Sequence, residues 1–130
     1  MAQFSKLDDA VKYRKSVMFV MQQHFSRVLS MAAGKTPFDA NAAAESIAVV
    51  GFMAKLPWEA FAEGTEKGAT RARPEIWTEP ARFKEYAALT QAELGKLAIA
   101  IQTNSTEDIR SAVRAAAMTC QTCHDAFRKD

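Results

Sequence analysis

The sequence lacks the features that mark membrane-spanning and nucleic-acid-binding proteins. No apolar run approaches the roughly 18 residues that a membrane-spanning helix needs. Lys and Arg number 17 against 15 Asp and Glu, and they form no long basic run, so the formal net charge of +2 does not suggest nucleic-acid binding. A chain of 130 residues suffices for one hydrophobic core, and we expect a single domain over residues 1–130.

A secretory signal peptide is also missing from the printed sequence. The opening stretch MAQFSKLDD has neither a basic segment nor an apolar segment. This leaves two hypotheses, a cytoplasmic protein or an exported protein that has lost its leader and gained a Met. The cysteine motif described below decides between them.

Glycine and proline are scarce, with five and four residues, and their positions divide the chain into helical segments. Residues 8–33 contain neither. In that window apolar side chains recur at spacings of three and four, which is typical of one buried helix face. The residues of this face are Val11, Met18, Met21, Phe25, Val28 and Ala32.

Three further helices are predicted by capping residues and by the same periodicity. Asp39 can cap a helix over residues 40–55. Thr78 as N-cap, with Pro80 in the first turn, predicts a helix that runs to about residue 102. Ser105 or Thr106 can cap the last helix, over residues 106–129.

No segment shows the alternation of a convincing strand, so we predict an all-α fold. Four amphipathic helices with short turns and one long connection favour an antiparallel four-helix bundle. The long connection is a crossover over residues 56–78, between the second and third helices. We expect it to contain a helical turn at 57–62 and to be pinned by Trp58, Phe61 and Trp77.

Both cysteines of the chain and one of its two histidines lie in the stretch CQTCH, as Cys120, Cys123 and His124. C-x-x-C-H is the pattern of covalent haem attachment. The two thiols bind the two haem vinyl groups, and the histidine that follows becomes an axial ligand of the iron. Cys120 and His124 are four residues apart and therefore share one helix face.

Three alternatives for this motif are less favoured. A C-x-x-C redox pair prefers a βαβ setting, which this sequence does not predict. A zinc site lacks a second cysteine pair, and the only other histidine, His24, is remote in the chain. A disulfide between Cys120 and Cys123 would be strained on a helix. Because bacteria attach c-type haem on the exported side, we expect a periplasmic protein.

A helical bundle with C-x-x-C-H at its C-terminal end resembles the class II c-type cytochromes, and cytochrome c′ in particular. The similarity covers nearly the whole chain, and the similar segments follow one another in the same order as in the family. The similar segments are DAVKYRKS, LPWEAF, RPEIWTEPARF and CQTCHDAFRKD. The resemblance implies one covalent haem c per chain, with five-coordinate and largely high-spin iron.

The resemblance also implies roles for individual residues. His124 would be the proximal ligand, with Arg128 one turn further on beside it. Arg14 would lie near a haem propionate, and its position on the apolar face of the first helix calls for a buried anionic partner. The walls of the haem pocket would be formed by Trp58, Phe61, Phe83 and Phe127.

Met18 occupies the family's distal position, and two hypotheses follow. As an apolar cover it would admit NO and CO, while offering no hydrogen bond to bound O₂. We favour this first hypothesis, in which the protein binds gases. As a thioether ligand, Met18 would instead give a low-spin, six-coordinate electron carrier with His124 and Met18 on the iron.

Catalysis and partners are less clearly marked in the sequence. Peroxidase-like chemistry is disfavoured because no distal acid–base pair is present, so we do not expect an enzyme. The family implies a homodimer through the first two helices, where the small residues of NAAAESIA permit close packing and Phe19 or Met31 supplies apolar surface. A redox partner cannot be named from a nearly neutral chain.

Overall fold

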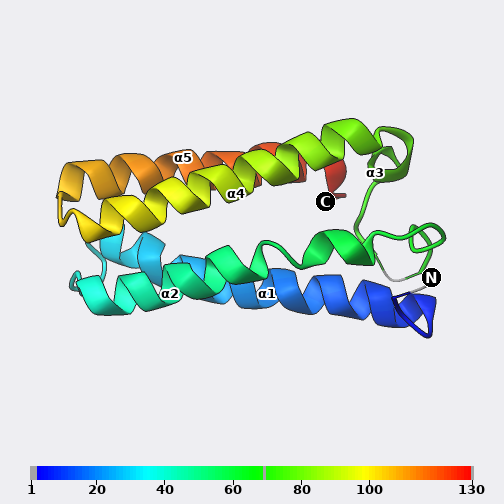
Figure 1. Cartoon of the computed structure of the whole chain (residues 1–130), viewed down its shortest axis with the longest axis horizontal. Helices are drawn as coiled ribbons and strands as arrows, with labels where there is room; N and C mark the ends of the chain where they lie inside the picture. The colour runs from blue at the N-terminus through cyan, green and yellow to red at the C-terminus, as the bar shows by residue number, and fades with distance from the viewer. Residues whose placement is uncertain (1–2, 69, 130) are drawn as a thin grey trace.

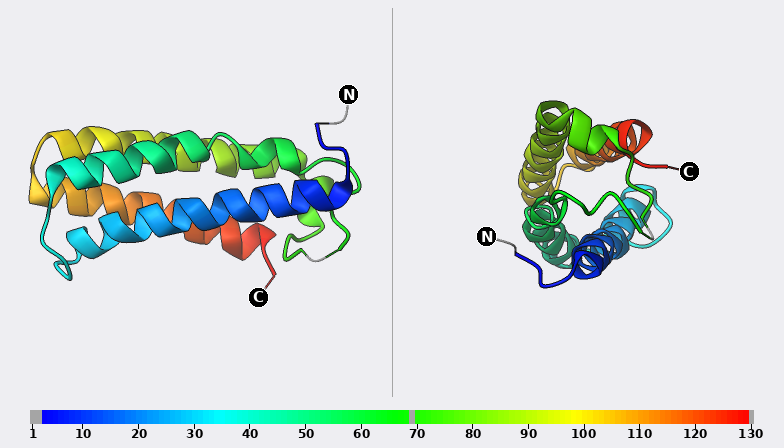
Figure 2. Two further views of the ribbon diagram at one scale, coloured as in Figure 1. Left: turned by 90° about the horizontal axis from the view of Figure 1, so that it is seen from below. Right: turned by 90° about the vertical axis from the view of Figure 1, so that its right-hand side faces the viewer.

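The computed structural model describes residues 3–68 and 70–129, and in those residues the chain forms helices and loops (Figure 1). The long helices are α1 (Leu7–Ala32), α2 (Ala40–Met53), α4 (Pro80–Gln102) and α5 (Thr106–Phe127). Helices α1 and α2 form one layer and α4 and α5 the other, and the end view of Figure 2 shows the four axes near the corners of a square. The predicted all-α four-helix bundle is confirmed.

Two of the predicted helix caps are present. The Asp39 carboxylate accepts a hydrogen bond from the Ala42 amide at 3.0 Å, which satisfies one of the free N–H groups at the start of α2. Of the two candidates before α5, Ser105 is the cap, and its hydroxyl accepts from the Asp108 amide at 3.2 Å. Each short polar side chain therefore begins a helix, as the sequence predicts.

The prediction that Thr78 caps the third long helix is wrong. Pro74 begins a short helix, α3 (Glu75–Thr78), and its carbonyl accepts the amides of Trp77 and Thr78. Thr78 is therefore inside a helical turn, where it cannot adopt the extended backbone of an N-cap. The residue before α4 is Glu79, which makes no side-chain capping bond, and Pro80 opens the helix as expected.

The crossover between α2 and α4 contains a single 3₁₀ turn, η1 (Pro57–Ala60), at its start. Its later part, residues 71–73, lies antiparallel to residues 127–129 at the end of α5. The Arg73 amide donates to the Phe127 carbonyl at 2.9 Å, and the Lys129 amide donates to the Arg71 carbonyl at 2.6 Å. Because residue 128 turns extended to make this pairing, α5 ends at Phe127 and not at the predicted 129.

The buried apolar side chains form two groups along the bundle. The larger group fills the half that contains the α1–α2 and α4–α5 turns, and it includes Val28, Ile47, Leu97 and Ile101. The smaller group lies at the crossover end and is largely aromatic. No helix in the described part of the chain has the length and apolarity needed to cross a membrane.

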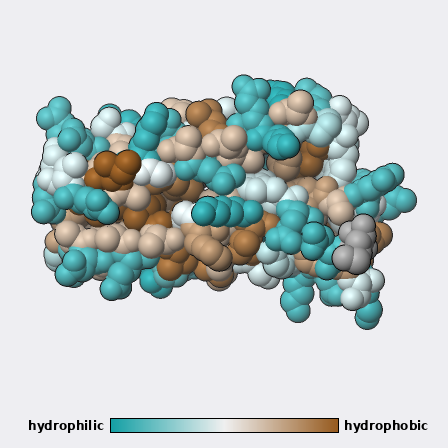
Figure 3. All heavy atoms as spheres, viewed as in Figure 1, coloured by the Kyte–Doolittle hydropathy of each residue, from teal (hydrophilic) through white to brown (hydrophobic). Residues whose placement is uncertain are grey.

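Some large apolar side chains remain on the surface. Figure 3 looks onto α2 and α4, and several apolar patches lie in the middle of this face with hydrophilic side chains between and around them. Phe52 of α2 is 64% exposed and Phe19 of α1 is 60% exposed. Met31, the other residue expected to supply apolar surface, is half-buried and packs against the larger core group.

Candidate functional site

The two cysteines lie on the half-buried face of α5, at the boundary between the two core groups. Cys120 packs against the larger group and Cys123 against the aromatic group. They are three positions apart in the sequence, so along the helix axis they are about 4.5 Å apart. This face of α5 therefore presents two thiols side by side to the interior of the bundle.

Both thiols are free and are held in their neutral form. Burial raises the pKa of the Cys123 thiol to about 11, with a smaller contribution from the neighbouring Cys120. Burial also raises the pKa of Cys120. Because a redox-active cysteine needs a lowered pKa to form its thiolate, these raised values do not favour a C-x-x-C redox pair.

His124 follows directly on α5 and is exposed beside a polar hollow of about 270 Å³. Four cations gather in this hollow: Arg71, Arg73, Arg128 and Lys129. Gln121 and Asp125 complete its lining. The crossover and the end of α5 thus surround one face of the histidine with positive charge.

Two influences lower the pKa of His124 from its ordinary value. Partial desolvation of the ring is the larger, and the positive charge of Arg128 is the next. The Asp125 carboxylate opposes them, and Arg71 adds a further lowering. The ring is therefore neutral at pH 7, which is the form in which a histidine binds a metal ion.

The four aromatic residues named as pocket walls come together at the crossover end. Phe83 is central, with ring centroids 4.9 Å from Phe61, 5.1 Å from Phe127 and 5.6 Å from Trp58. These pairs are edge-to-face, the arrangement that aromatic rings prefer. Cys123 packs against the same group, so the motif and the aromatic wall are adjacent.

Arg14 is buried at 3% exposure, and in the described residues its guanidinium donates hydrogen bonds to neutral oxygens. One Nη donates to the Ala60 carbonyl at 2.9 Å and to the Thr65 hydroxyl at 2.8 Å. The other donates to the Thr65 carbonyl at 2.8 Å and to the Thr70 hydroxyl at 3.0 Å. The guanidinium also lies 4.5 Å from the centre of the Phe61 ring. In the described structure Arg14 therefore ties α1 to the crossover.

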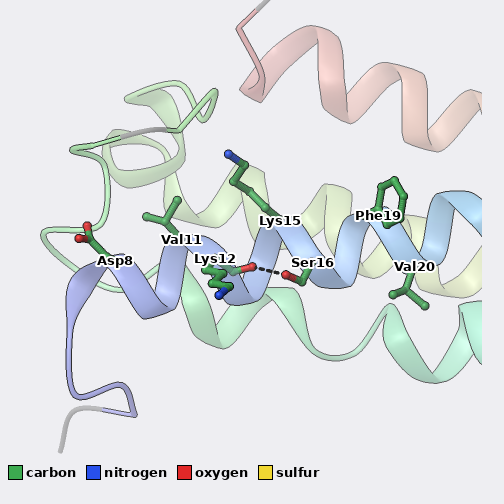
Figure 4. A pocket seen from close by; sticks show the side chains of 7 residues that line it. All are labelled: Asp8, Val11, Lys12, Lys15, Ser16, Phe19 and Val20. Atoms are coloured by element: carbon green, nitrogen blue, oxygen red, sulfur yellow. Dashed lines mark hydrogen bonds between the residues drawn. The ribbon is translucent and has the colours of Figure 1, made fainter.

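Met18 lies one turn beyond Arg14 on α1 and is half-buried. It belongs to neither core group, and the α1 groove of about 680 Å³ shown in Figure 4 is lined by its neighbours instead. That groove follows α1 from Asp8 to Val20, with Lys15 and Phe19 extending on the side that faces α5 in this view. The structure thus places Met18 on the inner side of α1, apart from the cationic hollow.

The residues present fit a covalently attached haem. Two neutral thiols share one helix face, an imidazole follows them, and an aromatic group borders them. In residues 3–68 and 70–129, His, Cys, Asp and Glu form no group of three or more that could hold a metal ion alone. An iron held here would need a ligand that brings its own donors, as a porphyrin does.

Several residues near the motif were not predicted from sequence. Arg71 and Arg73 approach His124 only because the crossover pairs with the end of α5, and loop residues carry no periodicity that reveals such pairing. Thr65 and Thr70 are likewise loop threonines that no sequence signal singles out, because their role comes from the hydrogen bonds that Arg14 donates to them. Trp77 was expected to pin the crossover, and its indole donates to the Phe61 and Ala62 carbonyls at 3.1 Å each.

Comparison with known proteins gives consistent matches over almost the entire chain. The family model described as Cytochrome C' matches residues 9–128. Cytochrome c' of Rubrivivax gelatinosus is 44% identical over 128 residues, which are 98% of this chain and 99% of the relative. The crystal structure of cytochrome c' from that organism has a TM-score of 0.93 at 44% identity and covers 98% of this chain and 100% of its own.

Another solved structure that matches this chain contains a ligand. A nitric oxide complex of a variant of cytochrome c prime from Alcaligenes xylosoxidans has a TM-score of 0.92 at 38% identity, covering 98% of this chain and 99% of that one. These relatives agree with the resemblance predicted from CQTCH and from the helical bundle. Proteins of this family carry covalently bound haem c, and nitric oxide complexes are known among them. The chain therefore belongs to the cytochrome c′ family of haem-carrying, gas-binding proteins.

Proposed function

We propose that residues 1–130 form one periplasmic unit that binds NO and CO at a five-coordinate haem. Cys120 and Cys123 hold the haem through thioether bonds, and His124 is its proximal ligand. When bound, the haem iron supplies the open coordination position for the gas. The observation that carries this proposal is the pair of half-buried thiols on α5 with the imidazole directly after them, in a family that includes a nitric oxide complex.

The residues around the motif have supporting roles in this proposal. Arg128 contributes a positive charge that lowers the pKa of His124, so the imidazole is kept from taking up a second proton and keeps a free nitrogen for the iron. Trp58, Phe61 and Phe83 exclude water from the pocket, because their rings pack against one another beside Cys123. A dry pocket of this kind favours a small uncharged ligand over an ion.

On the distal side we propose that Met18 covers the haem without binding the iron. Its half-buried position one turn beyond Arg14 supports an apolar cover. The other histidine, His24, lies six residues further along α1 and contacts Arg27 at 3.4 Å. A distal acid–base pair of the kind that peroxide chemistry needs is therefore not part of this proposal, and we assign no catalytic role.

Replacing Met18 with alanine tests this assignment. Because the thioether is proposed to stay off the iron, we expect Met18→Ala to keep the broad haem bands of an open sixth position. Removing the side chain also opens the distal space, so CO should bind faster, by about tenfold, which corresponds to a barrier lower by about 1.4 kcal/mol. Absorption spectra and stopped-flow CO mixing measure both effects.

The matched control is Met31→Ala, which changes the same residue type on the same helix about 20 Å away. It should lower stability, because Met31 packs against the larger core group, and should leave spectrum and CO rate unchanged. If the unaltered protein shows sharp split bands that Met18→Ala broadens, then Met18 is an iron ligand, and the electron-carrier hypothesis replaces the gas-binding one.

We further propose that two copies associate through α1 and α2. The large exposed side chains Phe19 and Phe52 support this, since single domains seldom leave several such side chains uncovered without use. Helix α2 is rich in alanine, which permits a close approach of a second helix. Met31 contributes less than the sequence suggested, because it packs inside its own chain.

A further inference from the structure

The outer face of α4 differs from an ordinary solvated helix surface because its centre carries no charge. A period of 3.6 residues places five exposed residues along that centre, and we call them the α4 outer face: Ala81, Ala88, Ala92, Gly95 and Ile99. Ile99 is 67% exposed, and Leu89 at one edge of the face is 50% exposed. On the neighbouring helix α5, the solvent side instead includes Arg110 and Arg114.

Gly95 is not required by the packing within one chain. It lies inside α4 without a positive φ, and a Cβ added there would meet nothing within 4 Å. A glycine inside a helix is less favourable than alanine, because it loses more backbone freedom on folding. No contact within the described chain explains this cost, whereas the close approach of a second backbone would explain it.

The α4 outer face is accessible in the folded bundle. Helix α4 packs against α5 and α2, and the end view of Figure 2 shows it diagonally across from α1. All five residues of the face are exposed, so neither the crossover nor the turns cover them. A contact made by this face therefore uses none of the residues proposed above for pairing through α1 and α2.

Two charged residues at one edge make the face complementary to a second copy of itself. Glu85 and Lys96 are exposed on the same edge, eleven positions apart, which is about 16 Å along the helix axis. When a second α4 packs antiparallel about a two-fold axis midway between them, Glu85 of each copy comes level with Lys96 of the other. The two-fold axis forms this ion pair twice, because contacts across such an axis are reciprocal.

The same register brings large side chains opposite small ones. Ile99 of one copy comes level with Ala81 of the other, and Ala88 comes level with Ala92. Small side chains at the middle of the contact allow the two helices to approach closely, while the isoleucines fill the space at its ends. Lys84 lies on the other edge of the face, on the side away from Lys96 of the second copy. Shape and charge therefore agree on one antiparallel arrangement.

We propose that the α4 outer face is a docking surface for a second copy of this chain, packed antiparallel and held by two ion pairs between Glu85 and Lys96. This contact joins two of the pairs formed through α1 and α2 into an assembly of four chains. One helix from each copy buries less than about 1,200 Å², the range of weak and transient contacts. The assembly therefore forms reversibly and at high protein concentration.

Charge reversal tests the register of the contact. Sedimentation equilibrium of the holoprotein should show the average mass doubling as the concentration rises. Glu85→Lys and Lys96→Glu each place like charges opposite one another, so both variants should lose this doubling. An equimolar mixture of the two should regain it, because every contact then joins two lysines of one copy to two carboxylates of the other. The double variant Glu85→Lys/Lys96→Glu, whose net charge is unchanged, should also regain it.

Removing apolar surface provides a second test with a matched control. Leu89→Gln/Ile99→Gln should lose the doubling of mass, and circular dichroism should show an unchanged helix content because both side chains are exposed. The control is Met118→Gln, which replaces an apolar side chain of α5 that is 62% exposed, and it should associate like the unaltered protein. In Phe19→Ser/Phe52→Ser, where pairing through α1 and α2 is removed, the doubling should persist and lead from one chain to two.

Two results would overturn the proposal. If the unaltered protein at millimolar concentration is no heavier than Leu89→Gln/Ile99→Gln, a second copy does not dock on α4, and the face is left to a different protein or to solvent. If Glu85→Lys and Lys96→Glu associate as strongly as the unaltered protein, the copies meet through another surface. Because the readout is mass, it stays separate from haem binding and from the gas-binding proposal.

Discussion

Changing both Cys120 and Cys123 to alanine is expected to abolish the retention of haem by the denatured chain. Thioether bonds survive unfolding, whereas coordination by His124 does not, so the unaltered protein should keep one haem per chain after denaturation and the variant none. Haem-dependent staining of the protein on a denaturing gel measures this, together with extraction of free haem by acidified acetone. The expected change is complete and not partial.

The control for this prediction is Thr122→Ala, which alters an exposed residue between the two cysteines. It should retain haem fully, because its side chain does not lie on the buried face of α5. Single variants at Cys120 and Cys123 should each keep haem through the remaining thioether bond. Retention of haem by the denatured double variant would mean that the cysteines are not the attachment sites.

Replacing Arg14 with alanine is expected to lower the free energy of unfolding by roughly 3 kcal/mol. The substitution removes the Arg14 donors from the Ala60 carbonyl and from the Thr65 carbonyl and hydroxyl, and of these the Thr65 hydroxyl keeps its own bond to the Ala62 carbonyl at 2.6 Å. Each buried polar group that loses its hydrogen bond costs about 1–3 kcal/mol. Urea unfolding of the holoprotein, followed by circular dichroism, measures the effect.

Two further variants distinguish the effect of the Arg14 hydrogen bonds on stability from the effect of its positive charge. Arg14→Lys keeps the positive charge but loses the planar fork that reaches both Thr65 and Thr70, so we expect it to recover less than half of the loss. Arg27→Ala removes an exposed arginine of the same helix and should change stability by less than about 0.5 kcal/mol. A fully stable Arg14→Ala protein would show that the crossover does not depend on this side chain.

The helices could be predicted because their signals are local. Scarce glycine and proline, three- and four-residue spacing of apolar side chains, and the caps Asp39 and Ser105 all act within one or two turns of helix. The Thr78 prediction failed for a related reason. Pro74, four residues earlier, starts a helical turn that includes Thr78, so two local signals competed and the earlier one prevailed.

The residues of the candidate site also fall into two kinds, those that a local motif predicts and those that only the fold brings together. Cys120, Cys123 and His124 follow from one short motif, and their chemistry depends little on the rest of the chain. The partners of Arg14 could not be predicted, because Thr65 and Thr70 lie more than 50 residues away in a loop without periodicity. The cations around His124 are similarly brought together by one backbone pairing between the crossover and the end of α5.

The measurement that tests the central claim most directly is an absorption spectrum of protein matured in the periplasm, ferric and ferrous, with and without CO. We predict a broad ferrous Soret band, one broad visible band and a clear shift on adding CO, as expected for haem held by Cys120, Cys123 and His124 with an open sixth position. Sharp split visible bands with no response to CO would contradict the gas-binding proposal. The complete absence of haem bands would contradict the assignment of the site itself.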